Sequence, residues 1–141
     1  MALEPSFVNL QTIARSKSED AVLLLAHGRF ANAYYLAGYA VEIGLKACIA
    51  LRFLAERLPD RRLVNAIHTH QLNDLILHAG LENILDERRS QNREFSDNWT
   101  RVCKWHPDSR YSTVDGFTAQ RMVHAVSDSQ TGVLEWIKEY W

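Results

Sequence analysis

The sequence predicts an all-α protein, a single domain over residues 1–141 built as a bundle of about five helices. The most apolar stretch, residues 29–54, contains no proline and is far too long for a strand, so it should be a helix that is buried on most sides. Apolar residues recur at helical intervals elsewhere, and no segment alternates as a strand does. With 141 residues, 47% of them hydrophobic, the chain can bury one core of ordinary size.

Residues 5–28 precede this central helix and carry an apolar face. Pro5 suits a first helical turn, and Gly28 is a natural stop. Residues 16–19, SKSE, have the form of a capping box, which leaves open whether this region forms one helix or two. Because the break after Gly28 is short, the region should fold back on the central helix as an antiparallel hairpin.

The central helix combines a close-packing line with a polar line, and it should end before Pro59. Small residues at alternating steps of four and three fall on one line, where a second helix can approach closely: Ala33, Ala37, Ala40, Gly44 and Ala47. A second line carries Tyr35, Tyr39, Glu42, Lys46 and Ile49, so one polar stripe runs along this otherwise apolar helix. This polar stripe is the first candidate for a functional surface.

Shorter elements follow Pro59. Residues 61–70 should form a loop or a single turn, and Thr69 can cap a helix that Gly80 closes. Another helix begins at Leu81. Residues 86–94, DERRSQNRE, are polar on every side, so we expect them to be solvated or mobile.

Helical spacing returns near Phe95 and again over residues 117–141, which read as the last element. Between them, residues 105–113, WHPDSRYST, are rich in turn-forming residues and should form a loop.

Composition excludes several classes of function. The net charge is −1, from 17 acidic and 16 basic residues, so no global positive field would attract nucleic acid or an anionic membrane. No apolar run reaches the length of a membrane span, and the first residues lack the features of a signal peptide, so we expect no membrane association and a cytoplasmic location. Cys48 and Cys103 form no C-x-x-C pair and should be buried reduced thiols. His27, His78 and His124 stand alone on helices, so neither a metal site nor a cofactor is expected.

Three segments together resemble the HEPN family: AYYLAGYAVEIGLKA at residues 33–47, His70 followed by Gln-Leu, and Ser109-Arg110-Tyr111. The resemblance runs roughly from Arg15 to Trp141. It implies an up-and-down bundle of four to five helices that commonly dimerises, often beside a nucleotidyltransferase-like partner in toxin and antitoxin pairs. On this basis we expect a homodimer that acts as a nucleotide- or RNA-interacting module in a toxin or defence system.

Some HEPN members are metal-independent endoribonucleases that carry an Arg, four to six further residues, and then a His. Two pairs here have this spacing, Arg62 with His68 and Arg101 with His106, although each Arg is followed by an apolar residue where that branch has a polar one. Metal-free cleavage needs a base of near-neutral pKa for the 2′-OH proton and a cation for the charged phosphorane, and His with Arg supplies both.

For ligand binding the candidates are Lys46, His70, Arg110 and Tyr111, with Glu42 near Lys46. An Arg beside a Tyr can hold phosphate through its guanidinium while the ring stacks on a base. The alternative is structural: Glu42 pairs with Arg110 across the bundle and fixes the loop to the central helix. A protein-interaction bundle without any ligand is the third possibility.

Overall fold

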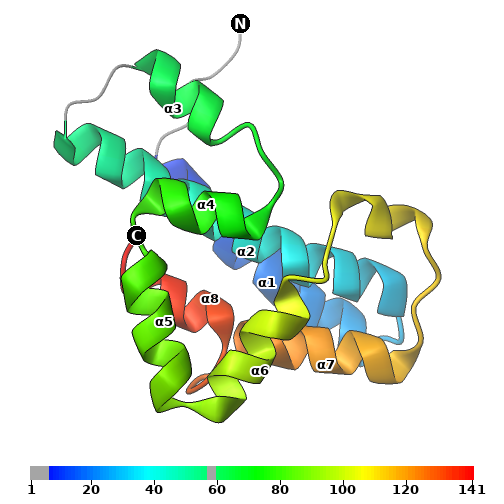
Figure 1. The fold of residues 1–141 in the computed structure, drawn as a ribbon. Helices are drawn as coiled ribbons and strands as arrows, with labels where there is room; N and C mark the ends of the chain where they lie inside the picture. The colour runs from blue at the N-terminus through cyan, green and yellow to red at the C-terminus, as the bar shows by residue number, and fades with distance from the viewer. Residues whose placement is uncertain (1–6, 57–59) are drawn as a thin grey trace, which may run out of the picture.

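The computed structural model describes residues 7–56 and 60–141, in which helices alternate with short connections and no strand occurs. The prediction of an all-α fold is confirmed. The described residues form eight α-helices and one 3-10 helix (Figure 1): α1 (Phe7–Ala26), α2 (Phe30–Glu56), α3 (Asp60–Ala66), α4 (Leu72–Ala79), α5 (Glu82–Gln91), α6 (Arg93–Val102), η1 (Pro107–Tyr111), α7 (Gly116–Ser127) and α8 (Val133–Ile137). These are more helices than predicted, because short breaks divide segments whose apolar pattern continues across them.

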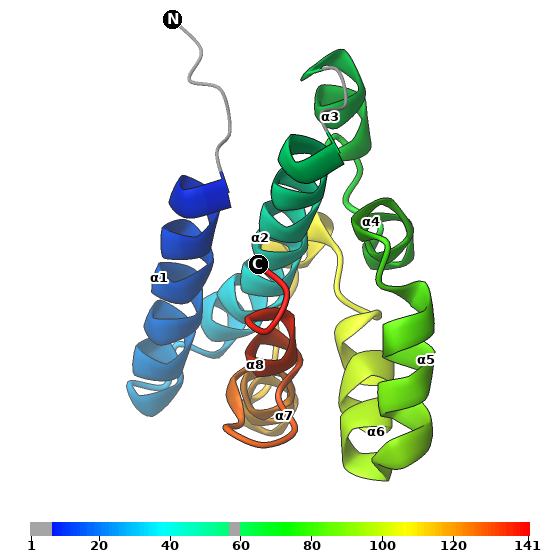
Figure 2. The ribbon, with the colours of Figure 1, turned by 90° about the vertical axis from the view of Figure 1, so that its left-hand side faces the viewer.

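Helices α1 and α2 form the hairpin that the sequence predicted, and they lie side by side in both views (Figures 1 and 2). The chain leaves α1 at Gly28, whose φ of +74° favours glycine. The Arg29 N–H then donates to Leu24 O at 2.9 Å, which satisfies a carbonyl at the helix end. Because α1 is one continuous helix, the capping-box pattern at residues 16–19 does not start a second one.

Helix α2 runs through the middle of the molecule, and its small residues are buried as expected. The close approach predicted at Gly44 is made by α8: a Cβ at Gly44 would lie 3.0 Å from Leu134 Cδ1 and 3.3 Å from Ile137 Cγ2. Helix α2 ends at Glu56. Pro59, at which the helix was expected to stop, lies outside the described residues.

The connection from α2 to α4 is more helical than a loop, since it contains α3. Thr69 does not cap α4, whose N-cap residue is Gln71. The Thr69 hydroxyl instead accepts from the Gln71 N–H at 3.1 Å and so stabilises the turn before the helix. Gly80, with φ +73°, closes α4 as predicted, and Arg52 Nη1 donates to the terminal carbonyl of His78 at 2.8 Å.

The polar segment 86–94 was expected to be solvated or mobile; none of its residues is buried, and all but Asn92 lie in helices. Helix α5 continues to Gln91, and α6 begins after an extended Asn92, whose side chain accepts from the Phe95 N–H at 2.9 Å. Arg89 Nε donates to Ser96 Oγ at 3.0 Å and thereby joins the two helices. A helix can carry polar side chains on all sides when some of them form hydrogen bonds with neighbouring elements.

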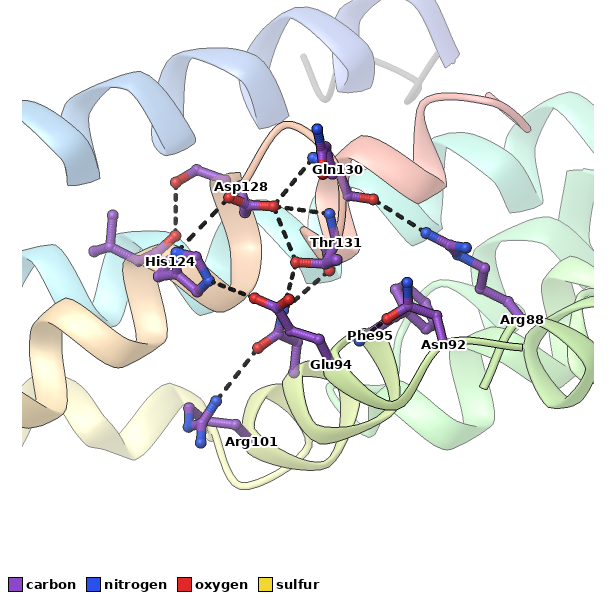
Figure 3. Close-up of polar contacts among 12 residues, drawn as sticks. Arg88, Asn92, Glu94, Phe95, Arg101, His124, Asp128, Gln130 and Thr131 are labelled. Atoms are coloured by element: carbon purple, nitrogen blue, oxygen red, sulfur yellow. Dashed lines mark hydrogen bonds and ion pairs between the residues drawn. The ribbon is translucent and has the colours of Figure 1, made fainter. Parts of the chain in front are cut away.

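The last predicted element is two helices, α7 and α8, separated by a tight turn (Figure 3). The Asp128 carboxylate accepts from the backbone N–H of Gln130 at 3.1 Å and of Thr131 at 2.8 Å. Gly132 is required there because a Cβ would overlap Asp128 O and would lie 2.7 Å from Asp128 N and from Val126 O. The buried Asn98 of α6 donates to Thr131 O at 3.0 Å, which ties the turn to α6.

Helices α7 and α8 lie between the α1–α2 pair and the α5–α6 pair (Figure 2). The large side chains that fill this centre include Trp99, Phe95, Leu45 and Met122, all at most 2% exposed. None of the helices in residues 7–56 and 60–141 is both long and apolar enough to cross a membrane.

Candidate functional site

The polar stripe of α2 contains a buried carboxylate. Glu42 is 1% exposed. Its Oε1 lies 2.8 Å from His70 Nδ1, and its Oε2 lies 3.3 Å from Lys46 Nζ. A buried carboxylate is costly unless it is paired and hydrogen-bonded, and here each oxygen has its own partner. The cluster therefore fixes the start of α4 to the middle of α2.

Local geometry explains how these three residues meet. Glu42 and Lys46 are four apart on α2, so they lie on one face of the helix. His70 comes from the turn before α4, which is anchored by the buried Leu72. The His70 side chain remains 54% exposed, so the cluster reaches the surface through this imidazole.

A second cluster forms where η1 meets the same stripe one to two turns earlier. Trp105, at the end of the α6–η1 connection, packs against Gly38 of α2, where an added Cβ would overlap the indole ring. The indole Nε1 donates to Tyr35 O at 3.1 Å, and the Trp105 ring also contacts Tyr35 and Tyr39. This docking positions η1, and with it Arg110 and Tyr111, beside the stripe.

Arg110 and Tyr111 form an exposed stack. The guanidinium carbon lies 4.6 Å from the centre of the Tyr111 ring, and Nη1 donates to Pro107 O at 3.4 Å. Hydrogen bonding to the Tyr111 side chain, and secondarily to Tyr35, raises the pKa of Arg110 further, so it stays charged. In residues 7–56 and 60–141, no carboxylate pairs with this guanidinium. Tyr111 is 77% exposed.

Tyr39 lies between the two clusters. Burial raises its pKa, the Glu42 charge raises it further, and the Arg110 charge lowers it. The structure thus gathers Glu42, Lys46 and His70 in direct contact and adds Arg110 and Tyr111 through the tyrosines of the stripe. The alternative in which Glu42 pairs with Arg110 is wrong, because Glu42 forms its ion pairs with Lys46 and His70 and none joins it to Arg110.

The Arg101 and His106 pair is not brought together in one hollow. His106 caps η1, where its Nδ1 accepts from the Asp108 N–H at 3.1 Å, and it lines a hollow of about 480 Å³ beside η1. Arg101 lies on α6, donates to Asn98 Oδ1 at 3.3 Å, and lines a different hollow of about 460 Å³ between α6 and α7.

The Arg62 and His68 pair lies at the other end of the molecule. Arg62 is on α3 and His68 follows it in the connection to α4. Both side chains are exposed. Within the described parts of the chain, no hydrogen bond or ion pair joins one to the other.

Sequence analysis missed the residue that does accompany Arg101, which is His124 of α7 (Figure 3). His124 Nε2 lies 3.2 Å from Glu94 Oε1, and Nδ1 lies 3.9 Å from Asp128 Oδ1. Arg121 and the exposed ring of Phe117 line the same hollow. One local signal was present, since Arg121 and His124 are three apart on one helical face. The partners on α6 lie too far away in sequence for spacing to reveal them.

Comparison with protein-family models, with curated proteins and with solved structures found no match. In the part of the chain that the structure describes, no three His, Cys, Asp or Glu side chains gather as metal ligands would.

Proposed function

We propose that this chain is a HEPN-like helical module that binds a nucleotide or RNA at the surface formed by the α2 stripe, His70 and η1. The observation that carries the proposal is the Arg110–Tyr111 stack, an exposed cation without a carboxylate partner among the described residues beside an exposed aromatic ring. The family part of the proposal rests on the sequence resemblance and on the all-α fold.

Each group has a role in the bound state. Arg110 offers its planar guanidinium to a phosphate, which it can hold through two parallel hydrogen bonds. Tyr111 offers a face on which a base can stack. Glu42 acts indirectly, since it holds His70 at the edge of the surface, where the half-exposed imidazole can meet the ligand.

Replacing Arg110 with alanine should weaken binding of a short single-stranded RNA about 10- to 100-fold, because a charge-assisted hydrogen bond contributes about 1.5–3 kcal/mol. Tyr111→Ala should weaken binding to a similar degree, since stacking contributes about 1–3 kcal/mol per base. Fluorescence anisotropy with a labelled oligonucleotide, repeated with nucleoside monophosphates by calorimetry, measures both effects.

Arg93→Ala is the matched control, because it removes an exposed arginine from α6 and should leave affinity within about twofold once salt is fixed. If Arg93→Ala and Arg110→Ala lose the same amount of affinity, binding depends only on non-specific charge, which would contradict the assigned site. If no ligand binds the parent protein, the ligand-free interaction bundle replaces this proposal.

Metal-independent RNA cleavage is a second candidate function, and one observation favours a particular set of residues for it. The hollow between α6 and α7 holds Arg101 together with His124, and Glu94 binds the imidazole at 3.2 Å. A His oriented by a carboxylate can take the 2′-OH proton, and an arginine in the same hollow can stabilise the phosphorane. Arg101 with His106 lacks this shared hollow.

If the protein cleaves RNA in the presence of EDTA, His124→Ala should reduce the rate at least about 100-fold, in line with the loss of general acid–base catalysis. The His106→Ala and His68→Ala variants should retain most of the parent cleavage rate. Gel analysis of a labelled RNA substrate separates the three variants. If cleavage is lost only in His106→Ala or only in His68→Ala, catalysis belongs to the Arg–His pair that contains that histidine, and the assignment to His124 is contradicted.

The proposal includes a homodimer and a nucleotidyltransferase-like partner protein. Support for a dimer comes from two adjacent apolar side chains of α1 that remain exposed, Val22 and Leu23. Light scattering should give the mass of two chains, and a single-chain mass at micromolar concentration would contradict the dimer. Co-purification with a neighbour-encoded protein tests the partner.

A further inference from the structure

The hollow of about 460 Å³ between α6 and α7 is lined by polar side chains that are bonded within the fold and by others that are not. The bonded ones form two pairs. His124 Nε2 lies 3.2 Å from Glu94 Oε1, and Arg101 Nη1 donates to Asn98 Oδ1 at 3.3 Å (Figure 3). These contacts leave the remaining side chains of the wall to be explained.

The remaining polar side chains are Asp97 of α6 and Gln120 and Arg121 of α7. All three are exposed. Within residues 7–56 and 60–141, none of them forms a hydrogen bond or an ion pair. Asp97 and Arg121 therefore bring opposite charges to one hollow without pairing with each other. Gln120 adds an amide, which both donates and accepts.

The wall also contains an aromatic ring that the core does not use. Phe117 is 65% exposed, and its nearest polar neighbour is Arg121, whose guanidinium carbon lies 5.2 Å from the ring centre. Most of the side chain is open to solvent. Exposed aromatic rings are the surfaces on which proteins stack unpaired bases, and this stacking is compatible with every base.

The two unpaired charges restrict the ligand further. A carboxylate only accepts hydrogen bonds and a guanidinium only donates them, so the ligand must present donors to one and acceptors to the other. A phosphate presents acceptors alone, which leaves the carboxylate without a partner. Guanine presents two neighbouring donors, N1–H and N2–H₂, and two neighbouring acceptors, O6 and N7, and the fork of an arginine matches that acceptor pair.

We propose that the hollow between α6 and α7 is a guanine subsite, in which the base stacks on Phe117, Asp97 accepts from N1–H and N2–H₂, and Arg121 donates to O6 and N7. This inference rests on the proposed RNA-binding function. The Arg110–Tyr111 stack binds nucleotides without regard to the base, and the hollow selects for a guanine in the same RNA. A volume of about 460 Å³ is within the range of about 300–1,000 Å³ that is usual for small-ligand sites.

The test measures fluorescence anisotropy of a short labelled RNA that contains adenine only, and of the same RNA with one guanine at its centre. The parent protein should bind the guanine RNA about tenfold more tightly, the effect of hydrogen bonds to charged groups. Two further RNAs carry an analogue in place of the guanine. Inosine lacks the 2-amino group and 7-deazaguanine lacks N7, so each should lose part of the preference.

Each analogue is matched to one variant. Asp97→Asn should bind guanine and inosine RNAs equally, while it still discriminates against 7-deazaguanine. Arg121→Ala should show the opposite pattern. Because the two RNAs are compared within one variant, the change in net charge cancels. Phe117→Ala should weaken binding of the guanine RNA and both analogue RNAs, since stacking does not depend on these edge groups.

The controls are Asp86→Asn on α5 and Arg93→Ala on α6, two exposed residues outside the wall of the hollow. Both should keep the full discrimination. Free GMP, titrated by calorimetry, distinguishes the two sources of a guanine base. If GMP binding depends on Asp97 and Arg121 but guanine RNA binds no more tightly than adenine RNA, the hollow takes the free nucleotide, and the assignment to RNA is overturned.

Equal affinity of the parent protein for all four RNAs, without such GMP binding, overturns the inference but leaves the proposed function intact, provided that Arg110→Ala still weakens each of them. Absence of binding by every RNA and by GMP overturns both. A guanine preference that survives unchanged in Asp97→Asn and in Arg121→Ala belongs to another surface, and this too rejects the inference.

Discussion

Replacing Gly38 with alanine is expected to lower the free energy of unfolding by about 3 kcal/mol, the upper part of the usual range for overpacking a core. An alanine Cβ would overlap the indole of Trp105, a rigid ring whose Nε1 is already bound to Tyr35 O. The ring must move for the variant to fold. Because Trp105 positions η1, the same substitution should also weaken the binding of any ligand that Arg110 contacts.

Chemical denaturation monitored by far-UV circular dichroism measures the loss, and Gly44→Ala is the control on the same helix. A Cβ at Gly44 meets the flexible end of Leu134 at 3.0 Å, and alanine regains about 1 kcal/mol of helix propensity, so the two effects should nearly cancel. Equal stability of Gly38→Ala and the parent protein would show that Trp105 does not occupy this position in solution.

Glu42→Ala, which removes the buried carboxylate, should lower the free energy of unfolding by about 2–3 kcal/mol. The variant loses two hydrogen bonds to cationic or imidazole partners and leaves a small cavity in α2. Part of the gross loss is offset, because His70 is half exposed and can bind water instead. Hydrogen exchange should also accelerate at the start of α4, which the cluster holds to α2.

The chain supplies a matched control for this prediction. Arg52 and Glu56 form an ion pair with the same spacing of four residues and the same 3.3 Å distance, but both side chains are well exposed. Glu56→Ala should cost less than about 0.5 kcal/mol, as is usual for exposed helix pairs. If the two substitutions cost the same, burial of Glu42 contributes nothing and the account of the cluster fails.

The features that sequence analysis predicted are those set by spacing along one helix. The long apolar run, the line of small residues around Gly44 and the polar stripe with Glu42 all follow from the helical period, and the structure contains each of them. The glycine stops at Gly28 and Gly80 follow from a conformational preference of one residue type. Such signals are local, so one sequence is enough to reveal them.

The features that it missed depend on partners distant in sequence. Trp105 lies 70 residues from the carbonyl of Tyr35 that it binds, and His124 lies 30 residues from Glu94. The requirement for glycine at position 38 comes from the indole of Trp105, which packs where a Cβ would lie. Residues 86–94 were expected to be solvated or mobile, and none is buried; their helical conformation was not predicted, because contacts such as that of Arg89 with Ser96 exist only in the folded chain.

The reactivity of the Cys48 thiol can report the rate at which α8 separates from α2. Its Sγ lies 3.9 Å from Ile137 O at the contact between α2 and α8, and burial raises its pKa to about 12. Alkylating reagents attack the thiolate, so near pH 8 this cysteine reacts only from conformations in which α8 has moved away. Cys103 is less deeply buried and should react sooner. The slower of the two labelling rates therefore reports how often α8 detaches from α2 under native conditions, without any substitution.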